Sequence, residues 1–315
     1  MSEVLADDQM AGFKKLIYFL EYVLTRFASG LFSLLPLRLA LCFARPVGFL
    51  MFSFLSKPRR MALENLRHAY QSEKSKSEIE EIARKAFIHL AEFGIEWLAM
   101  PRIIRTPARY LITVRQGEKV QAALKNKRGA IVLVCHTGNW EIMALMGGLL
   151  VARPVGASVY ALARPLKNPY LYQYALQLRG GMGLKSIDKS GGVRETFNCL
   201  RENGIVCVLI DQRVSEGSVE TNFFGRFALT TSLPAIAALR LGTPVFFNFL
   251  YRTNNLDYVM EVEGPISIES TGDVHRDIQT NTQRFVDRVE TEVRKNPDRW
   301  LWMHNRWRVQ HGHKD

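Results

Sequence analysis

The stretch 131-IVLVCHTGNWE-141 places a histidine directly after an apolar run and an acid five residues later. Residues 131–135 are typical of a buried strand, and the small polar residues after His136 are typical of a turn. A neutral imidazole takes a proton at cellular pH, and a carboxylate on its second ring nitrogen fixes its tautomer. His136 and Glu141 therefore predict a general base with an orienting acid, although a histidine in a capped turn without chemistry fits the same pattern.

The same stretch indicates where the nucleophile comes from. Cys135 adjoins His136 in the predicted strand, so its side chain should point to the opposite face, which disfavours a cysteine–histidine enzyme. The chain contains no Gly-x-Ser-x-Gly segment, which argues against a serine hydrolase with a nucleophile elbow. A substrate hydroxyl is then the expected nucleophile. The imidazole removes the proton, so neither a metal nor a cofactor is expected.

Strand-like and helix-like segments alternate through most of the chain and must position this site. The expected strands are Tyr110–Val114, Ala130–Cys135, Ala157–Ala161, Ile205–Ile210, Pro244–Tyr251 and Tyr258–Val262. The expected helices are Glu118–Lys125, Trp140–Leu150, Asn168–Leu178, Val193–Asn203, Leu233–Leu241 and Val274–Arg294. This alternation predicts an α/β sandwich with a central, largely parallel sheet, which binds ligands at the carboxyl ends of its strands. His136 stands at such an end.

The N-terminal segment differs from the rest. Residues 16–55 are strongly apolar, with basic clusters on both sides, a pattern that suits an anionic membrane surface. We therefore expect residues 1–60 to form a helical membrane-associating segment, spanning or interfacial, and residues 61–315 to form the α/β domain. A buried helical hairpin is the alternative. After a polar break, Ser77 and Glu80 have the spacing of a capping box and predict the start of the next helix.

Charge and cysteine content narrow the functional class. The net charge of +12 favours anionic partners such as phospholipid headgroups or phosphorylated substrates. A nucleic-acid-binding module is disfavoured, because the basic residues are spread along the chain and the apolar first sixty residues have no use in it. The four cysteines are scattered without a Cys-x-x-Cys pair, so neither disulfides nor a structural zinc site is predicted. A non-enzymatic membrane scaffold would need no histidine–acid pair.

The motif 136-HTGNWE-141 resembles the His-x-x-x-x-Asp/Glu signature of membrane acyltransferases, a group that includes the glycerol-phosphate acyltransferases. Five other segments follow in an order similar to the bacterial lipid A biosynthesis (late) acyltransferases: 60-RMALENLRHAY-70, 161-ALARPLKNPYL-171, 205-IVCVLIDQR-213, 223-FFGRFALTTS-232 and 297-PDRWLWMHNRWR-308. The resemblance covers nearly the whole chain. It implies a glycerol-phosphate-acyltransferase-like sandwich at the inner membrane, with its active site facing the cytoplasm.

The resemblance also implies an activity and roles for particular residues. The expected reaction moves an acyl chain from an acyl carrier protein thioester to a hydroxyl of a lipid A precursor. A mannosylated phosphatidylinositol or another glycolipid is the alternative acceptor. His136 corresponds to the base and Glu141 to its partner, and Arg164 matches the arginine that follows the next strand, suited to a phosphate or an oxyanion.

Three further residues are weaker candidates for substrate binding. Arg179, before two glycines, is a second candidate for holding a phosphate. Asp211 and Gln212 end a predicted strand at the same sheet edge as His136, where a turn-forming aspartate is as plausible as a substrate contact.

Overall fold

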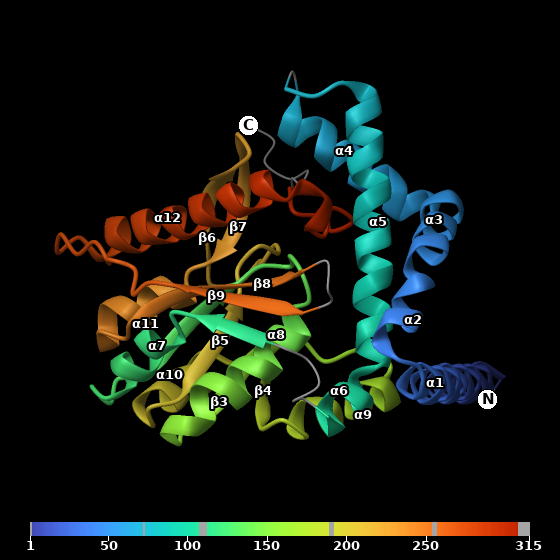
Figure 1. Ribbon diagram of the computed structural model, residues 1–315. Helices are drawn as coiled ribbons and strands as arrows, with labels where there is room; N and C mark the ends of the chain where they lie inside the picture. The colour runs from blue at the N-terminus through green and yellow to red at the C-terminus, as the bar shows by residue number, and fades with distance from the viewer. Residues whose placement is uncertain (1, 72, 107–111, 189–191, 254–256, 308–315) are drawn as a thin grey trace.

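The computed structural model describes residues 2–71, 73–106, 112–188, 192–253 and 257–307 and has a mixed α/β architecture (Figure 1). Its central sheet has the strand order β1-β9-β8-β2-β5-β3-β4. The strands of this sheet are β1 (Ile112–Arg115), β2 (Ala130–Val134), β3 (Val159–Ala163), β4 (Leu184–Asp188), β5 (Ile205–Leu209), β8 (Val245–Arg252) and β9 (Tyr258–Glu263). Among these described strands only the β8–β9 pair is antiparallel, which confirms the predicted, largely parallel sheet.

The sheet order sets which strand ends meet. β2 lies between β8 and β5, and all five of its residues are buried, as expected for an apolar strand covered on both faces. β5 pairs with β2 in parallel, with Val134 opposite Leu209. β3, the next strand in the sequence after β2, lies beyond β5. The segment after β5 is therefore the nearer neighbour of His136 in space.

Three strands escaped the sequence analysis. β4 is short and carries exposed Lys185 at its second position, so it lacks an apolar run. β6 (Ser218–Phe223) and β7 (Arg226–Thr231) form a separate antiparallel hairpin. This hairpin packs on α12 (Figure 1) rather than joining the sheet. The predicted strand Tyr110–Val114 falls partly outside the described residues, and β1 begins at Ile112.

Helices cover both faces of the sheet and extend to one side of it (Figure 1). They are α1 (Ser2–Leu34), α2 (Leu37–Cys42), α3 (Ala44–Phe54), α4 (Ser56–Tyr70), α5 (Lys76–Leu98), α6 (Met100–Arg105), α7 (Gly117–Leu124), α8 (Trp140–Gly147), α9 (Pro169–Gly180), α10 (Gly192–Arg201), α11 (Leu233–Leu241) and α12 (Val274–Lys295). A π-helical turn, Gly148–Ala152, continues α8.

The long helix α5 begins two residues earlier than predicted. Its N-cap is Ser75, whose side chain accepts from the backbone of Glu78 while the Glu78 carboxylate accepts from the Ser75 backbone. The expected capping box of Ser77 and Glu80 is therefore wrong. Two overlapping Ser-x-x-Glu patterns compete here, and Glu80 instead pairs with Arg84 one turn later, at 2.5 Å.

The N-terminal helices leave a large apolar surface uncovered. α1, α2 and α3 pack on α5, yet large side chains on their outer faces stay exposed, including Phe27, Leu34 and Phe54 at 73–78%. By length and composition alone, the helical stretch Leu37–Phe54 could cross a membrane. A soluble core would bury these side chains, so this face is suited to contact with lipid.

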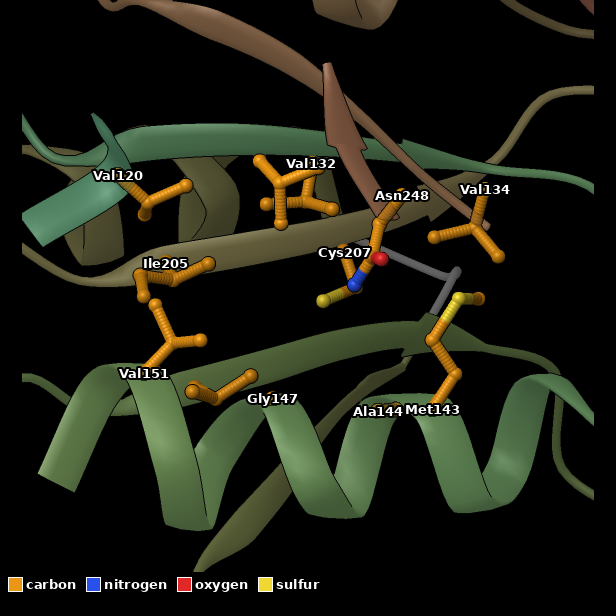
Figure 2. Close-up of a pocket in the computed structure, with 12 residues that line it drawn as sticks. Val120, Val132, Val134, Met143, Ala144, Gly147, Val151, Ile205, Cys207 and Asn248 are labelled. Carbon is orange, nitrogen blue, oxygen red and sulfur yellow. The ribbon is translucent and has the colours of Figure 1, made fainter. Parts of the chain in front are cut away.

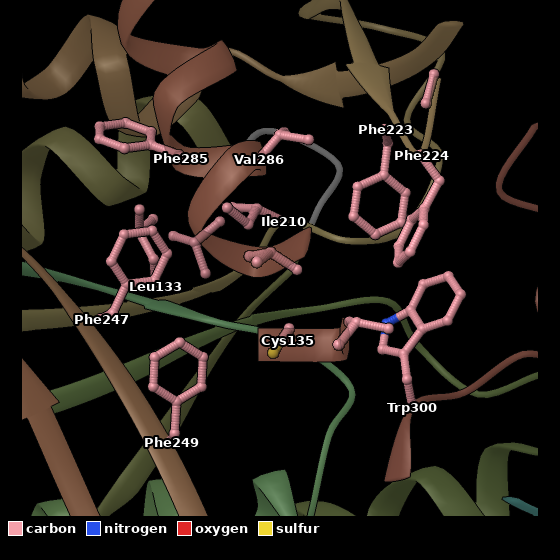
Figure 3. Packing of buried hydrophobic residues seen from close by; sticks show 14 of the residues in the cluster. Leu133, Cys135, Ile210, Phe223, Phe224, Phe247, Phe249, Phe285, Val286 and Trp300 are labelled. Atoms are coloured by element: carbon pink, nitrogen blue, oxygen red, sulfur yellow. The ribbon is translucent and has the colours of Figure 1, made fainter. Parts of the chain in front are cut away.

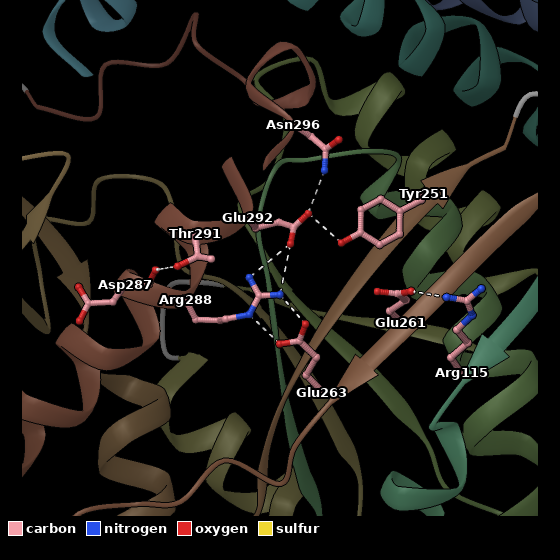
Figure 4. A network of polar contacts seen from close by, with 9 residues as sticks. All are labelled: Arg115, Tyr251, Glu261, Glu263, Asp287, Arg288, Thr291, Glu292 and Asn296. Atoms are coloured by element: carbon pink, nitrogen blue, oxygen red, sulfur yellow. Dashed lines mark hydrogen bonds and ion pairs between the residues drawn. The ribbon is translucent and has the colours of Figure 1, made fainter. Parts of the chain in front are cut away.

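Two apolar clusters lie on opposite faces of the sheet. One contains Phe247 and Phe249 of β8, aromatic residues of α12, the hairpin and the C-terminal segment, and Cys135 (Figure 3). The other lies between the sheet and α8. A polar network ties α12 to the sheet: Arg288 pairs with Glu263 and Glu292, and Glu292 accepts from the Tyr251 hydroxyl at 2.7 Å (Figure 4).

Candidate active site

His136 is held by an aspartate from the neighbouring strand end. Its Nδ1 lies 2.7 Å from Asp211 Oδ1, and its backbone N–H donates to Asp211 Oδ2, also at 2.7 Å. Asp211 follows β5 just as His136 follows β2, so the parallel pairing brings the two residues together. Both side chains are almost fully buried. The predicted shared sheet edge is confirmed, but the residue that orients the imidazole is Asp211.

Asp211 is ionised in spite of its burial. Burial acts to raise the pKa of this carboxyl group, but the charge on His136 and the hydrogen bonds from His136 and Trp300 outweigh it. The result is a pKa of about 2. Because the carboxylate only accepts hydrogen bonds, His136 must carry its proton on Nδ1 when neutral. The basic lone pair is then on Nε2.

The other ring nitrogen faces Gln212. The Gln212 amide nitrogen lies 3.1 Å from His136 Nε2, which accepts its N–H in this tautomer. Gln212, unlike Asp211, is partly exposed, so its amide can yield this position to a substrate hydroxyl. Gln212 therefore stays a candidate for substrate contact. Asp211 does not, because its carboxylate is occupied by His136 and Trp300.

The C-terminal segment completes the site, a role that the sequence analysis missed. The Trp300 indole N–H donates to Asp211 Oδ2 at 2.7 Å. Trp300, Trp302 and Trp307 are all buried, so these rings pack in the interior. The only signal in the sequence is the density of tryptophans, and it does not reveal a hydrogen-bond partner almost ninety positions away.

Glu141 does not contact the imidazole, so its predicted orienting role is wrong in its geometry. Its carboxylate forms a two-point pair with Arg179, at 3.0 Å from Nε and 2.5 Å from Nη2. Arg179 Nη1 also donates to Ser186. Both charged groups are mostly buried. Glu141 and Ser186 accept three hydrogen bonds from the guanidinium, and a role for Arg179 in holding a substrate phosphate stays a prediction.

The direction of α8 explains why Glu141 contacts Arg179 and not His136. α8 begins at Trp140, as predicted, and its N-cap Asn139 accepts from the Ile142 backbone. In the first turn of this helix the side chain of Glu141 is directed toward α9 and β4, while the Trp140 ring stands against His136 at 4.7 Å between centroids. Asn139 also donates to buried Glu96 of α5, at 2.7 Å, which anchors the catalytic turn to that helix.

Arg164 lines an open cleft that does not include His136. It follows β3, is exposed, and lines the cleft together with Val214, Thr231 and Ser232. Within the described ranges no ion pair involves Arg164. The charge of Arg164 contributes to lowering the pKa of His304. The main cause of this lowered pKa is burial, and the charges of His136 and Arg306 act in the same direction. Arg164 is therefore near the catalytic edge but one strand farther from His136 than the sequence order implies.

Cys135 is not a nucleophile in this arrangement. It is buried in the cluster on the far face of the sheet (Figure 3), and burial raises the pKa of its thiol well above the usual range. The thiol therefore stays protonated and inert at neutral pH. This confirms the predicted orientation of Cys135, on the face of the sheet away from α8.

Two narrow cavities follow α8 away from the catalytic turn. The first, of about 50 Å³, begins at Trp140 and Glu141, and the second, of about 30 Å³, reaches Val151 (Figure 2). Both are lined by Val134, Ala144 and Cys207, so they adjoin along the helix. From residue 140 to residue 151 a helix rises about 16 Å. The result is a mostly apolar channel that starts beside Trp140, whose ring makes an edge contact with His136.

A histidine oriented by a buried carboxylate, with a mostly apolar channel starting at the adjacent Trp140, is an arrangement that suits the activation of a substrate hydroxyl near a hydrocarbon chain. Comparison with known proteins agrees. The model of the family described as bacterial lipid A biosynthesis acyltransferase matches residues 10–309, so the chain belongs to this family. Its general activity is accordingly that of an acyltransferase.

The names of curated relatives give a different acceptor from the lipid A in the family's description. The chain is 26% identical over 227 residues to the phosphatidylinositol mannoside acyltransferases of two Mycobacterium tuberculosis strains, CDC 1551 / Oshkosh and ATCC 25618 / H37Rv. These matches cover 69% of this chain and 68% of each relative. It is 22% identical over 232 residues to the enzyme of the same name from Mycolicibacterium smegmatis, covering 72% of this chain and 73% of the relative.

Proposed function

We propose that the chain transfers a fatty acyl group from an acyl thioester to a hydroxyl group of a lipid A precursor. The observation that carries this proposal is the His136–Asp211 pair, which fixes the imidazole with its basic nitrogen directed away from Asp211 and its ring against Trp140, a residue that lines the start of the channel. Neither member of the pair needs a metal or a cofactor for this step.

The chemistry takes place in two steps. His136 Nε2 removes the proton of the acceptor hydroxyl as its oxygen attacks the thioester carbonyl carbon. The tetrahedral intermediate then collapses, the carbon–sulfur bond breaks, and the imidazolium returns the proton to the leaving thiolate. Asp211 stabilises the transient imidazolium. Because Cys135 is inert, the acyl group passes directly to the acceptor.

The channel along α8 would hold the acyl chain. Its walls are mostly apolar, with Glu141 and Arg179 near its start and Asn248 farther along, so burying the chain there is favourable at about 25 cal/mol per Å² of apolar surface. The unliganded cavities are narrow, and an acyl chain must displace wall side chains to enter. Met143, which lines the deeper cavity, is unbranched and adapts readily to such a change.

We propose acyl carrier protein as the donor's carrier and Arg164 as a ligand of a substrate phosphate. A guanidinium binds phosphate oxygens through two parallel hydrogen bonds, which lysine cannot reproduce. Arg164→Lys should therefore lower kcat/KM by about one to two orders of magnitude. Unchanged kinetics in both Arg164→Lys and Arg164→Ala would show that Arg164 does not bind the substrate.

A second acceptor, a mannosylated phosphatidylinositol, is favoured by the names of the curated relatives. The deciding experiment incubates purified protein and radiolabelled acyl-acyl carrier protein with each acceptor in detergent micelles. We expect label on the lipid A precursor. Label on the mannosylated lipid alone would show that this lipid, and not the lipid A precursor, is the acceptor. Label on neither lipid, with every thioester donor tested, would overturn the proposed function.

Residues 1–60 are proposed to attach the α/β domain to the inner membrane, with the site on the cytoplasmic side. The support is the uncovered apolar face of α1, α2 and α3. A chain that begins at Ser56 should leave the membrane fraction. If it still sediments with membranes, another surface provides the attachment.

A further inference from the structure

One polar side chain interrupts the wall of the deeper cavity. Asn248 stands in the middle of β8, in the apolar sequence 245-VFFNFLYR-252, and its side chain extends into the cavity (Figure 2). Its neighbours on the same face of the strand, Phe246 and Leu250, belong to the apolar cluster against α8. A strand in this position should carry an apolar residue there.

The Asn248 amide lacks the partners that a buried amide needs. The residue is 7% exposed, and its Oδ1 has no hydrogen-bond partner among the described residues. The other residues lining the cavity are apolar, apart from the weakly polar thiol of Cys207. An orphan of this kind costs free energy, so its presence requires an explanation. A trapped water is a poor one, because a buried water needs two to four polar partners.

The position of Asn248 along the strand indicates which part of a ligand it would meet. Phe247 is in register with Leu133, so Asn248 lies level with Val134, two residues before His136. Two residues of a strand correspond to about 7 Å. A polar group that reaches the amide must therefore lie near the reacting end of an acyl chain, not at its methyl end.

We propose that Asn248 selects an acyl chain that carries a hydroxyl group close to its carboxyl end. A hydroxyl both donates and accepts, so it satisfies the Asn248 amide in either orientation. A chain without the hydroxyl leaves the amide buried and unpaired, and a site of this kind discriminates strongly against such an analogue. This inference rests on the proposed function, because it takes the channel to be the acyl site.

The first test measures binding, which does not depend on turnover. The shift in thermal unfolding temperature is recorded for wild type and Asn248→Leu with 3-hydroxytetradecanoic acid and with tetradecanoic acid. Leucine has nearly the shape of asparagine but no polar group. We expect the hydroxy acid to give the larger shift with wild type and the plain acid to give the larger shift with Asn248→Leu. Equal shifts from both acids in both proteins would overturn the inference.

The second test measures transfer from the two corresponding acyl-acyl carrier proteins. Wild type should prefer the hydroxylated donor in kcat/KM by about ten- to a hundredfold, and Asn248→Leu should lose or reverse this preference. Gly147→Ala is the matched control, since an added Cβ there enters open space in the same cavity. It should slow both donors together and keep their ratio. A ratio near one in wild type would contradict the inference.

The unliganded protein provides a third readout. Removing an unpaired buried amide should stabilise it, so Asn248→Leu should unfold at a higher temperature than wild type without ligand. A lower temperature would mean that the amide already has a partner and would overturn the inference. The expected binding shifts without transfer from any thioester would instead count against the proposed function alone.

Discussion

Two buried ion pairs lie beside the first turn of α8, and they differ in what they leave unsatisfied. In the Glu141–Arg179 pair, two parallel hydrogen bonds and a third to Ser186 satisfy most of the polar atoms of both groups. In the His136–Asp211 pair, the carboxylate is fully engaged, but the outer imidazole nitrogen meets only the amide of Gln212. The Glu141–Arg179 pair, whose polar atoms are mostly hydrogen-bonded, stabilises the fold. The His136–Asp211 pair retains a basic lone pair on the outer imidazole nitrogen, which is available for chemistry.

The strongest test of this contrast removes the base itself. His136→Ala should lower kcat by about a thousand- to ten-thousandfold, because no other group near the acceptor hydroxyl takes its proton. The measurement is a steady-state transfer assay with labelled donor. Folding should be checked by circular dichroism, and a folded variant with more than a tenth of wild-type activity would contradict the role of His136.

Asp211→Asn tests the orienting acid. The asparagine amide can donate to Nδ1 and so favour the wrong tautomer, which should lower kcat by about a hundred- to a thousandfold with little change in KM. The same steady-state assay measures both constants. A change mainly in KM would instead indicate that Asp211 binds substrate.

Glu141→Gln should affect stability more than rate. It leaves the buried Arg179 charge without its partner and should lower the free energy of unfolding by about 3 kcal/mol, while kcat at a permissive temperature falls less than tenfold. Urea unfolding followed by tryptophan fluorescence measures the first effect. A folded Glu141→Gln protein as inactive as His136→Ala would place Glu141 in the chemistry and erase the contrast.

The smallest expected effect appears only in acid. The pKa of Asp211 lies at about 2, below the ordinary value near 3.9 that it takes in the unfolded chain. The stability from its ionised form is therefore present above about pH 4 and is lost as the pH falls toward 2, amounting to about 2–3 kcal/mol. The difference in unfolding free energy between wild type and Asp211→Asn should shrink over that range. A pH-independent difference would contradict the lowered pKa.

The sequence predicted the position of His136 better than it predicted the partner of this histidine. His136, the strand before it and the helix after it all follow local patterns, and the structure confirms the strand and the helix. The partner depends on sheet order, because Asp211 reaches His136 only if β5 lies next to β2. Glu141 is the acid nearest to His136 in the sequence, and this spacing predicted the wrong partner. In the folded chain the first turn of α8 directs the Glu141 side chain toward Arg179 instead.

The same limit applies to the residues that complete the site. Trp300 and Gln212 acquire their partners through contacts that span 89 and 76 positions of the chain. The hairpin β6–β7 was missed because it pairs with itself and packs on α12, outside the alternating pattern that revealed the sheet. Local periodicity predicts elements well, and it predicts their neighbours only where the chain order and the sheet order agree.

The bond between Trp300 and Asp211 has a consequence for the order of events during synthesis. During synthesis, α1, α2 and α3 are made first, and His136 and Asp211 follow. Trp300 is added later, near the end of the chain. Until the C-terminal segment docks, the carboxylate lacks its indole donor and the tryptophan cluster that shields it. A nascent or truncated chain can therefore complete its N-terminal helices well before Asp211 has its full set of hydrogen-bond partners, which form only when nearly the whole polypeptide has been made.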